Sequence, residues 1–313
     1  MFNHFKKKSF GERLKDTGYL FKHSFTIIGK DKDIKTPIIN MVAYSMIMLT
    51  ILMFSILLIV LKISIPLGVG MIIFSVFILG THRLFFNVRQ KADQSWIVYN
   101  TLIGKDVSYD QAHTHTKYHK GKLRFIAFID VLMTLARSQR GNKKGIIGVI
   151  ITLALTALVE VWDLLIHYMI PAVVIEQKKL KEIIPEIKSL KNNIPATLAG
   201  VFGIDFAGQV VGSIMFLIYL FVLAISVGIG WIMASLSSVA VVTIGSFSFS
   251  WIPVFVMFYI VLMIGAGFGI FVESIKIIYF TIFYMAITRP NEITPDIRNE
   301  VTHYLRMEKG KKV

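Results

Sequence analysis

The stretch VEVWDLLIHYM places three ionisable residues, Glu160, Asp163 and His167, inside an otherwise apolar run. Their spacing of i, i+3 and i+7 puts the three side chains on one face of a helix. A charged group at the centre of a bilayer costs on the order of 3 kcal/mol, so it normally faces a partner or a water-filled cavity. The pattern therefore predicts either a face that lines an ion or proton path, with a histidine that titrates near neutral pH, or a buried network that fixes helix packing. Trp162 and Tyr168, whose types favour membrane interfaces, support the structural alternative or a helix end among the headgroups.

A second pair of charges stands in the most apolar part of the chain. Glu273 and Lys276 are the only formal charges between residues 210 and 288. Side chains three positions apart meet on one helix face, so we predict an intramembrane ion pair. Charges inside membranes usually pair with one another, and the expected role of this pair is to hold helices together.

Three histidines, His113, His115 and His119, follow Asp110 in the stretch QAHTHTKYHKGK. On an extended segment the first two rings would point to the same side, and the third could complete a metal site. The segment is rich in lysine, however, and a solvated basic loop is the favoured interpretation. The sequence contains no phosphate-binding glycine loop, catalytic triad spacing or HExxH-type motif, so we expect neither an enzyme nor a bound cofactor.

The elements that must position these residues are membrane helices. The chain has 313 residues, of which 55% are hydrophobic, and a mean hydropathy of +0.65. Soluble domains rarely reach these values, and several apolar runs are long enough to span lipid. The formal net charge is +15, and the basic residues flank the apolar runs, which indicates anionic lipid headgroups and cytoplasmic loops rather than nucleic acid. The absence of cysteine excludes disulfides, thiol catalysis and thiolate metal sites.

Apolar length divides the chain into spans and flanking segments. We predict a basic amphipathic N-terminal segment at the membrane surface (1–36), a membrane domain (37–288) and a polar basic tail (289–313). The expected spans lie near residues 37–61, 67–86, 145–171, 210–236 and 251–288, with a basic cytoplasmic loop at 87–122 and an amphipathic surface helix at 176–192. The apolar run 123–136 is too short for an ordinary span and is interfacial, re-entrant or an abbreviated membrane helix. The last span is too long for one crossing, so it bends at 265–269 or projects from the membrane. The serine-rich stretch before it is a buried loop or part of a further span.

Three stretches resemble an uncharacterised family of prokaryotic six-helix integral membrane proteins. FKHSFTIIGKDKDIKTPIIN is similar to the entry of that family, in which a short segment with an Asp-Lys pair leads to a proline and the first helix. VWDLLIHYMIPAVVIEQKKLKEIIPEIKSL is similar to its central elbow, where a membrane helix ends in a proline, crosses V-x-x-E and continues as a surface helix. SIKIIYFTIFYMAITRPNEITPDI is similar to its last helix, although Tyr284 and Ala286 stand one residue closer than in the family pattern. The resemblance implies six helices in three hairpins with the elbow helix on the cytoplasmic side, and it implies no activity.

Together these features predict an all-α polytopic integral membrane protein with about six transmembrane helices in hairpins plus amphipathic interfacial helices. We expect it in the cytoplasmic membrane of a prokaryote, with both termini on the cytoplasmic side. The first functional hypothesis is an oligomeric channel or transporter that uses the polar face of Glu160, Asp163 and His167. The alternative is a non-catalytic scaffold, or a subunit that binds lipid or a partner protein. Expected partners are membrane lipids, with anionic headgroups at the basic loops, and a second copy or another membrane protein; no nucleic acid is expected.

Overall fold

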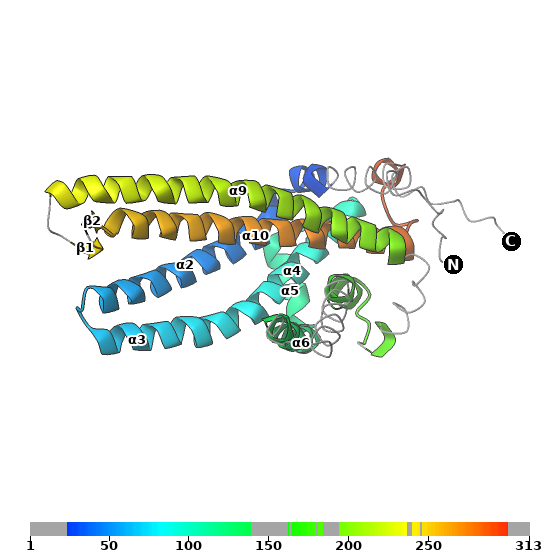
Figure 1. The fold of residues 1–313 in the computed structure, drawn as a ribbon. Helices are drawn as coiled ribbons and strands as arrows, with labels where there is room; N and C mark the ends of the chain where they lie inside the picture. Colours follow the sequence, from blue (N-terminus) through cyan, green and yellow to red (C-terminus); the bar gives the residue numbers. More distant parts are fainter. Residues whose placement is uncertain are drawn as a thin grey trace, which may run out of the picture. The chain divides into compact units, whose positions relative to one another are not determined.

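The computed structural model describes residues 24–138, 162, 165–179, 181–183, 194–236, 240–244 and 246–299. Over these residues the chain is mostly helical, with one two-stranded hairpin (Figure 1). The predicted all-α class is thus confirmed in its main feature. The chain forms two compact units: unit 1 comprises Met1–Met41, Thr81–Ile204 and Phe271–Val313, and unit 2 comprises Val42–Gly80 and Asp205–Ile270. Each unit is described by itself below.

Four helices are long and apolar enough to cross a membrane. They are Lys32–Val60, Ile65–Leu102, Gly208–Leu236 and Ile252–Thr288. They coincide with four of the five predicted spans, because long apolar runs are the strongest signal in such a sequence. The fifth predicted span, 145–171, lies mostly outside the described residues. The count of about six membrane helices therefore stays a prediction.

The first part of unit 2 is a helical hairpin. Helix α2 (Lys35–Val60) is followed, after a short turn, by α3 (Ile65–Ile73), and π-helical η2 (Phe74–Leu79) continues the latter. Gly68 makes the close approach of the two helices possible, since a Cβ atom there would lie 2.5 Å from Ile59 Cγ1 and 2.9 Å from the Ser55 carbonyl oxygen. The turn between the two helices lies at residues 61–63. Pro66 stands after it, in the first turn of α3, where its missing N–H costs nothing.

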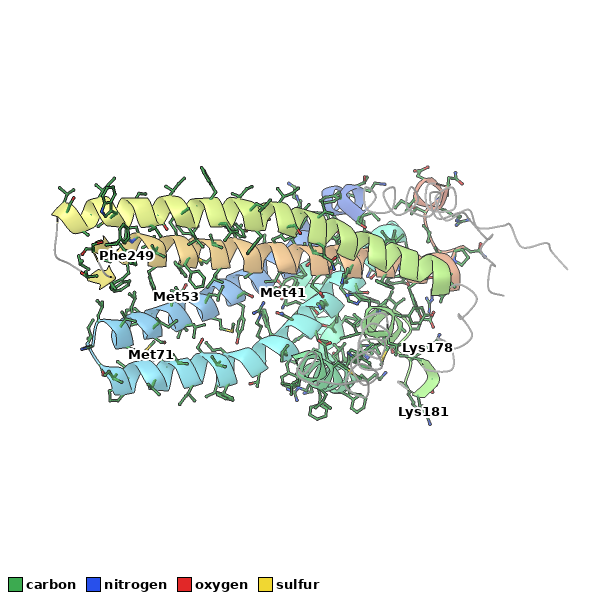
Figure 2. All side chains as sticks on the ribbon, in the orientation of Figure 1. Met41, Met53, Met71, Lys178, Lys181 and Phe249 are labelled. Carbon is green, nitrogen blue, oxygen red and sulfur yellow. The ribbon has the colours of Figure 1, made fainter. Side chains whose placement is uncertain are left out.

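The second part of unit 2 joins α9 (Ile194–Leu236) to α10 (Ile252–Thr288) through strands β1 (Val241–Ile244) and β2 (Phe247–Ser250) (Figure 1). The strands pair antiparallel, with Val241 opposite Ser250 and Ile244 opposite Phe247. The serine-rich stretch is thus neither a loop nor a span. Its β-branched residues and the serine–phenylalanine alternation favour a short hairpin. Figure 2 labels Phe249 on β2, whose ring lies 3.7 Å from the Cβ position of Gly230 in α9.

Large apolar side chains on the unit 2 helices are exposed. Phe77, Leu217 and Phe221, for example, each expose about two thirds of their surface. Contiguous exposed apolar surface of this extent is rare on a soluble monomer. The residues of unit 2 thus have the length, composition and exposure that suit a lipid environment.

Unit 1 has a packed core. It is built from α4 (Gly80–Leu102), α5 (Tyr109–Lys117), α6 (Lys120–Ser138), the helix Leu165–Ile175 and the part of α10 from Phe271 onward. Its largest fully buried side chains in α10 are Tyr279, Phe280, Phe283 and Tyr284. Helix α10 stays helical through residues 265–269. Its apolar length exceeds one membrane crossing because the residues after 270 are buried in protein.

The prediction of a loop at residues 87–122 is wrong, because most of this segment is helical. These residues form most of α4, all of α5 and the start of α6. The buried face of α4 carries polar residues whose partners lie elsewhere in unit 1: Gln90 bonds to Tyr109, and Ser95 shares a 2.9 Å hydrogen bond with Thr281. Polar side chains paired across helices leave no apolar periodicity in the sequence, and so the segment had the pattern of a loop.

The described parts of the predicted surface segments also pack into protein. In the N-terminal segment, residues 24–30 are helical and Ile27 and Ile34 belong to the core of unit 1. In the C-terminal segment, Ile293 and Ile297 belong to the same core. The predicted amphipathic helix 176–192 does not begin at 176, because residues 176–179 are not helical; residues 181–183 are helical, and most of the rest lies outside the described residues.

Candidate functional site

Three ionisable side chains from distant parts of the sequence meet in unit 1. The Lys91 Nζ atom of α4 lies 2.6 Å from Oε2 of Glu273 in α10. The His167 Nε2 atom lies 3.7 Å from the same oxygen. The side chains of His167, Lys91 and Glu273 are 1%, 12% and 38% exposed. One oxygen of the Glu273 carboxylate therefore faces two basic side chains that are themselves nearly inaccessible to water.

Two further charged residues belong to this group. The indole Nε1 of Trp162 donates to Asp130 Oδ1 of α6 over 3.3 Å. Burial raises the pKa of Asp130, and the positive charge of Lys91 opposes part of that rise. Lys276 is buried and adds positive charge to the surroundings of Glu273. Below, the Glu273 cluster means Lys91, Asp130, His167, Glu273 and Lys276.

The structure joins two sites that the sequence treated separately. His167 was predicted on one polar face and Glu273 in a different ion pair, and here they are neighbours. The strongest partner of Glu273 is Lys91, which sequence reasoning missed, rather than Lys276 alone. Glu160 and Asp163, the other members of the predicted face, lie outside the described residues. The local spacing within one helix carried no signal for a partner 182 positions away.

A second buried network centres on Asp93 of α4. Its carboxylate is fully buried and lies 2.8 Å from His113 Nδ1, and it also accepts a hydrogen bond from the Thr116 hydroxyl. His113 and Thr116 both lie on α5, so their contacts with the Asp93 carboxylate hold α5 against α4. Burial raises the energetic cost of any change that removes either donor.

The other two histidines take different partners. His115 Nε2 lies 2.9 Å from the Val174 carbonyl oxygen, and its ring stacks on Trp96 at a centroid distance of 3.6 Å. Burial lowers the pKa of His119, with a further contribution from the charges of His115 and Lys122. The metal site considered as the alternative for His113, His115 and His119 is not formed, because His113 bonds to Asp93 and His115 bonds to Val174 and stacks on Trp96. Within the described ranges, no group of three His, Cys, Asp or Glu side chains is placed to hold a metal ion.

Helix α6 has two apolar faces with different surroundings. Leu123, Ile126 and Ala127 are buried in the core of unit 1. On the other side, four large apolar side chains are between 47% and 58% exposed: Phe125, Phe128, Leu132 and Leu135. Their spacing places them on one helix face, called the α6 stripe below. The helix 120–138 thus presents a continuous apolar surface outside the core.

Comparisons of the chain with protein-family models, with curated proteins and with solved structures found no match.

Proposed function

We propose that the chain is an integral membrane protein whose unit 1 is a non-catalytic module that binds lipid or a partner at the membrane surface. The helices Lys32–Val60, Ile65–Leu102, Gly208–Leu236 and Ile252–Thr288 would supply the membrane crossings. At 1.5 Å per residue even the 29 residues of the third are about 43 Å long, which exceeds a hydrocarbon core of about 30 Å. In this proposal the membrane is the cytoplasmic membrane of a prokaryote, and both basic termini are cytoplasmic.

The α6 stripe is the observation that carries the proposal. A helix that buries one apolar face in protein and exposes a second one of four large side chains needs another apolar environment. Burial of apolar surface is worth roughly 25 cal/mol per Å², so leaving this face in water would forgo several kcal/mol. Basic residues beside it, Lys120 and Arg124, suit an interface with anionic headgroups. An interfacial position was one of the alternatives predicted for 123–136.

The chain itself allows a direct test of this position. It has no cysteine, so single substitutions Phe128→Cys and Leu132→Cys can each carry one environment-sensitive fluorophore. Tyr118→Cys, at a residue that is 83% exposed, is the matched control. In lipid vesicles we expect labels at 128 and 132 to emit at shorter wavelength and to be quenched by brominated lipid. Equal quenching of Leu132→Cys and Tyr118→Cys by aqueous iodide would refute the proposal.

The second candidate function is proton or ion transport, and the Glu273 cluster is the observation that favours it. A carboxylate shared by a lysine and a histidine can exchange a proton between defined partners. Flux through wild-type protein in liposomes, lost in a folded Glu273→Gln variant and kept in Glu292→Gln, would support transport. Glu292 is the control because its carboxylate is 46% exposed and accepts its hydrogen bonds, from Arg289 and Tyr99, at the surface. Glu160→Gln/Asp163→Asn tests the predicted face in the same assay. Absence of flux for several ions and voltages would refute this candidate.

A further inference from the structure

A basic pocket of about 630 Å³ opens on unit 1 beside the α6 stripe. Its lining comes from one face of α4, from the end of α5 and from the start of α6: His82, Phe85, Phe86, Arg89, Lys117, Lys120, Leu123 and Arg124. Among the described residues that line it, four are permanently charged cations and none is acidic. The volume lies in the range of small-molecule sites. The pocket therefore suits an anion with an apolar part.

Arg89 of α4 lines this pocket and is half-buried. Its Nε atom is buried and has no hydrogen-bond partner within the described part of the chain. One of its terminal nitrogens, Nη2, donates to the His113 carbonyl oxygen over 3.4 Å. The nearby carboxylate of Asp93 is already bonded to His113 and Thr116. A guanidinium with an unused buried donor is well suited to a phosphate oxygen, which accepts charge-assisted hydrogen bonds.

The pocket has apolar lining residues from both helices. Phe85 of α4 lines it and is exposed, and Leu123 of α6 lines it too. Arg124 and Phe128 stand one helical turn apart, so the cationic wall of the pocket passes directly into the α6 stripe. A headgroup phosphate seated among the cations would leave its acyl chains along Phe128 and the residues beyond it.

We propose that this pocket binds the phosphate of an anionic phospholipid, with the acyl chains against the α6 stripe. The inference rests on the proposed membrane position of unit 1 and names the ligand of that surface. Free phosphate shares the chemistry of the headgroup, but the apolar stripe beside the cations favours the lipid. Neutral lipids lack the net charge that four cations would balance.

The test compares lipid selectivity of the full chain in nanodiscs. Spin-labelled phosphatidylglycerol and phosphatidylcholine report the relative association of anionic and neutral lipid. The pocket variant is Arg89→Gln/Lys120→Gln/Arg124→Gln, and the control Lys30→Gln/Lys105→Gln/Lys181→Gln removes the same charge from exposed positions away from the pocket. Each basic residue near a surface contributes about 1 kcal/mol of lipid attraction, so we expect the pocket variant to lose about tenfold or more in preference for phosphatidylglycerol. The control should keep at least half of it.

Each other result has a definite meaning. Equal losses in the two triple variants, or no loss in the pocket variant, overturn the pocket proposal. Displacement of bound phosphatidylglycerol by millimolar glycerol phosphate would reveal a phosphate site without lipid selectivity and would overturn it too. The exposed pair Lys120→Gln/Arg124→Gln, which spares half-buried Arg89, guards against a folding defect. It should show about two thirds of the free-energy loss of the triple variant while keeping the wild-type unfolding midpoint. The fluorophore at Leu132→Cys reports the membrane position of unit 1 separately, so failure of the pocket and failure of the proposed function are distinguishable.

Discussion

Removing the shared carboxylate should destabilise the protein more than removing its strongest partner. In the Glu273→Leu variant, Lys91, His167 and Lys276 lose the anion that they surround. In the Lys91→Met variant, by contrast, Glu273 keeps His167 at 3.7 Å and the charge of Lys276. Breaking a buried ion pair costs roughly 3–5 kcal/mol. The 38% exposure of the Glu273 side chain lets water screen the pair, so we expect about 2–3 kcal/mol for Glu273→Leu and about 1 kcal/mol for Lys91→Met.

Thermal unfolding in detergent, followed by tryptophan fluorescence at pH 7.5, can measure this difference. A loss of 1 kcal/mol lowers the midpoint by roughly 2–4 °C in a domain of this size, so we expect about 4–12 °C for Glu273→Leu and about 2–4 °C for Lys91→Met. The double variant should lose less than the sum of the two single ones, because replacing both members of a buried pair by apolar residues removes the stranded charge. An equal or larger loss for Lys91→Met would refute the shared-anion geometry.

Three further outcomes follow from local geometry and titration. Gly68→Ala should lower the unfolding midpoint while Gly70→Ala should not, because only the Cβ atom at 68 meets the facing helix; an equal effect would refute close packing there. Because burial raises the pKa of Asp130 in the folded protein, the folded state gains stability as the pH falls through that pKa. Asp130→Asn should therefore raise the unfolding midpoint at pH 7.5, and this advantage should disappear near pH 4. The pKa of Glu176 is lowered, although burial opposes this, because basic neighbours bond to its carboxylate. The ionised carboxylate therefore stabilises the fold at neutral pH, and this contribution is lost as the pH falls below the usual glutamate range. The lower unfolding midpoint of Glu176→Gln at pH 7 should accordingly return to the wild-type value in acid. Midpoints measured across this pH range test both carboxylates.

The four long apolar helices were predictable because apolar length is a local property of the sequence. The same signal could not separate lipid from protein as the apolar environment. Residues Phe271–Thr288 continue the apolar pattern of α10, but Phe280 and Tyr284 are buried in the core of unit 1. A helix that is apolar all round is buried somewhere, and its sequence does not say in what.

The packed core of unit 1 was not predicted, because some of its buried residues are polar. Its helix α4 buries Gln90, Asp93 and Ser95, which look like surface residues in the sequence. Their hydrogen-bond partners come from α5 and α10 and satisfy them in the folded chain. The candidate site was predicted only in part. The sequence singled out His167 and Glu273 as ionisable residues in apolar segments, but only the tertiary fold brings Lys91 next to Glu273.

Part of the lining of the basic pocket can be recognised in the sequence, but not by a search for apolar periodicity. His82, Phe85, Phe86 and Arg89 recur at i, i+3, i+4 and i+7, which is one face of α4. Two phenylalanines stand on that face between His82 and Arg89, so the face counts neither as an apolar stripe nor as a charge run. The fold then sets Lys120 and its neighbours opposite this face, and cations within a Debye length of about 8–10 Å repel one another. In the Glu273 cluster the positive charges are offset by carboxylates of the same chain. The described lining of the pocket supplies none, and the Asp93 carboxylate near Arg89 is bonded to His113 and Thr116. An anion from outside the chain would offset this repulsion, which makes the pocket the stronger indication of a ligand than the buried ion pairs.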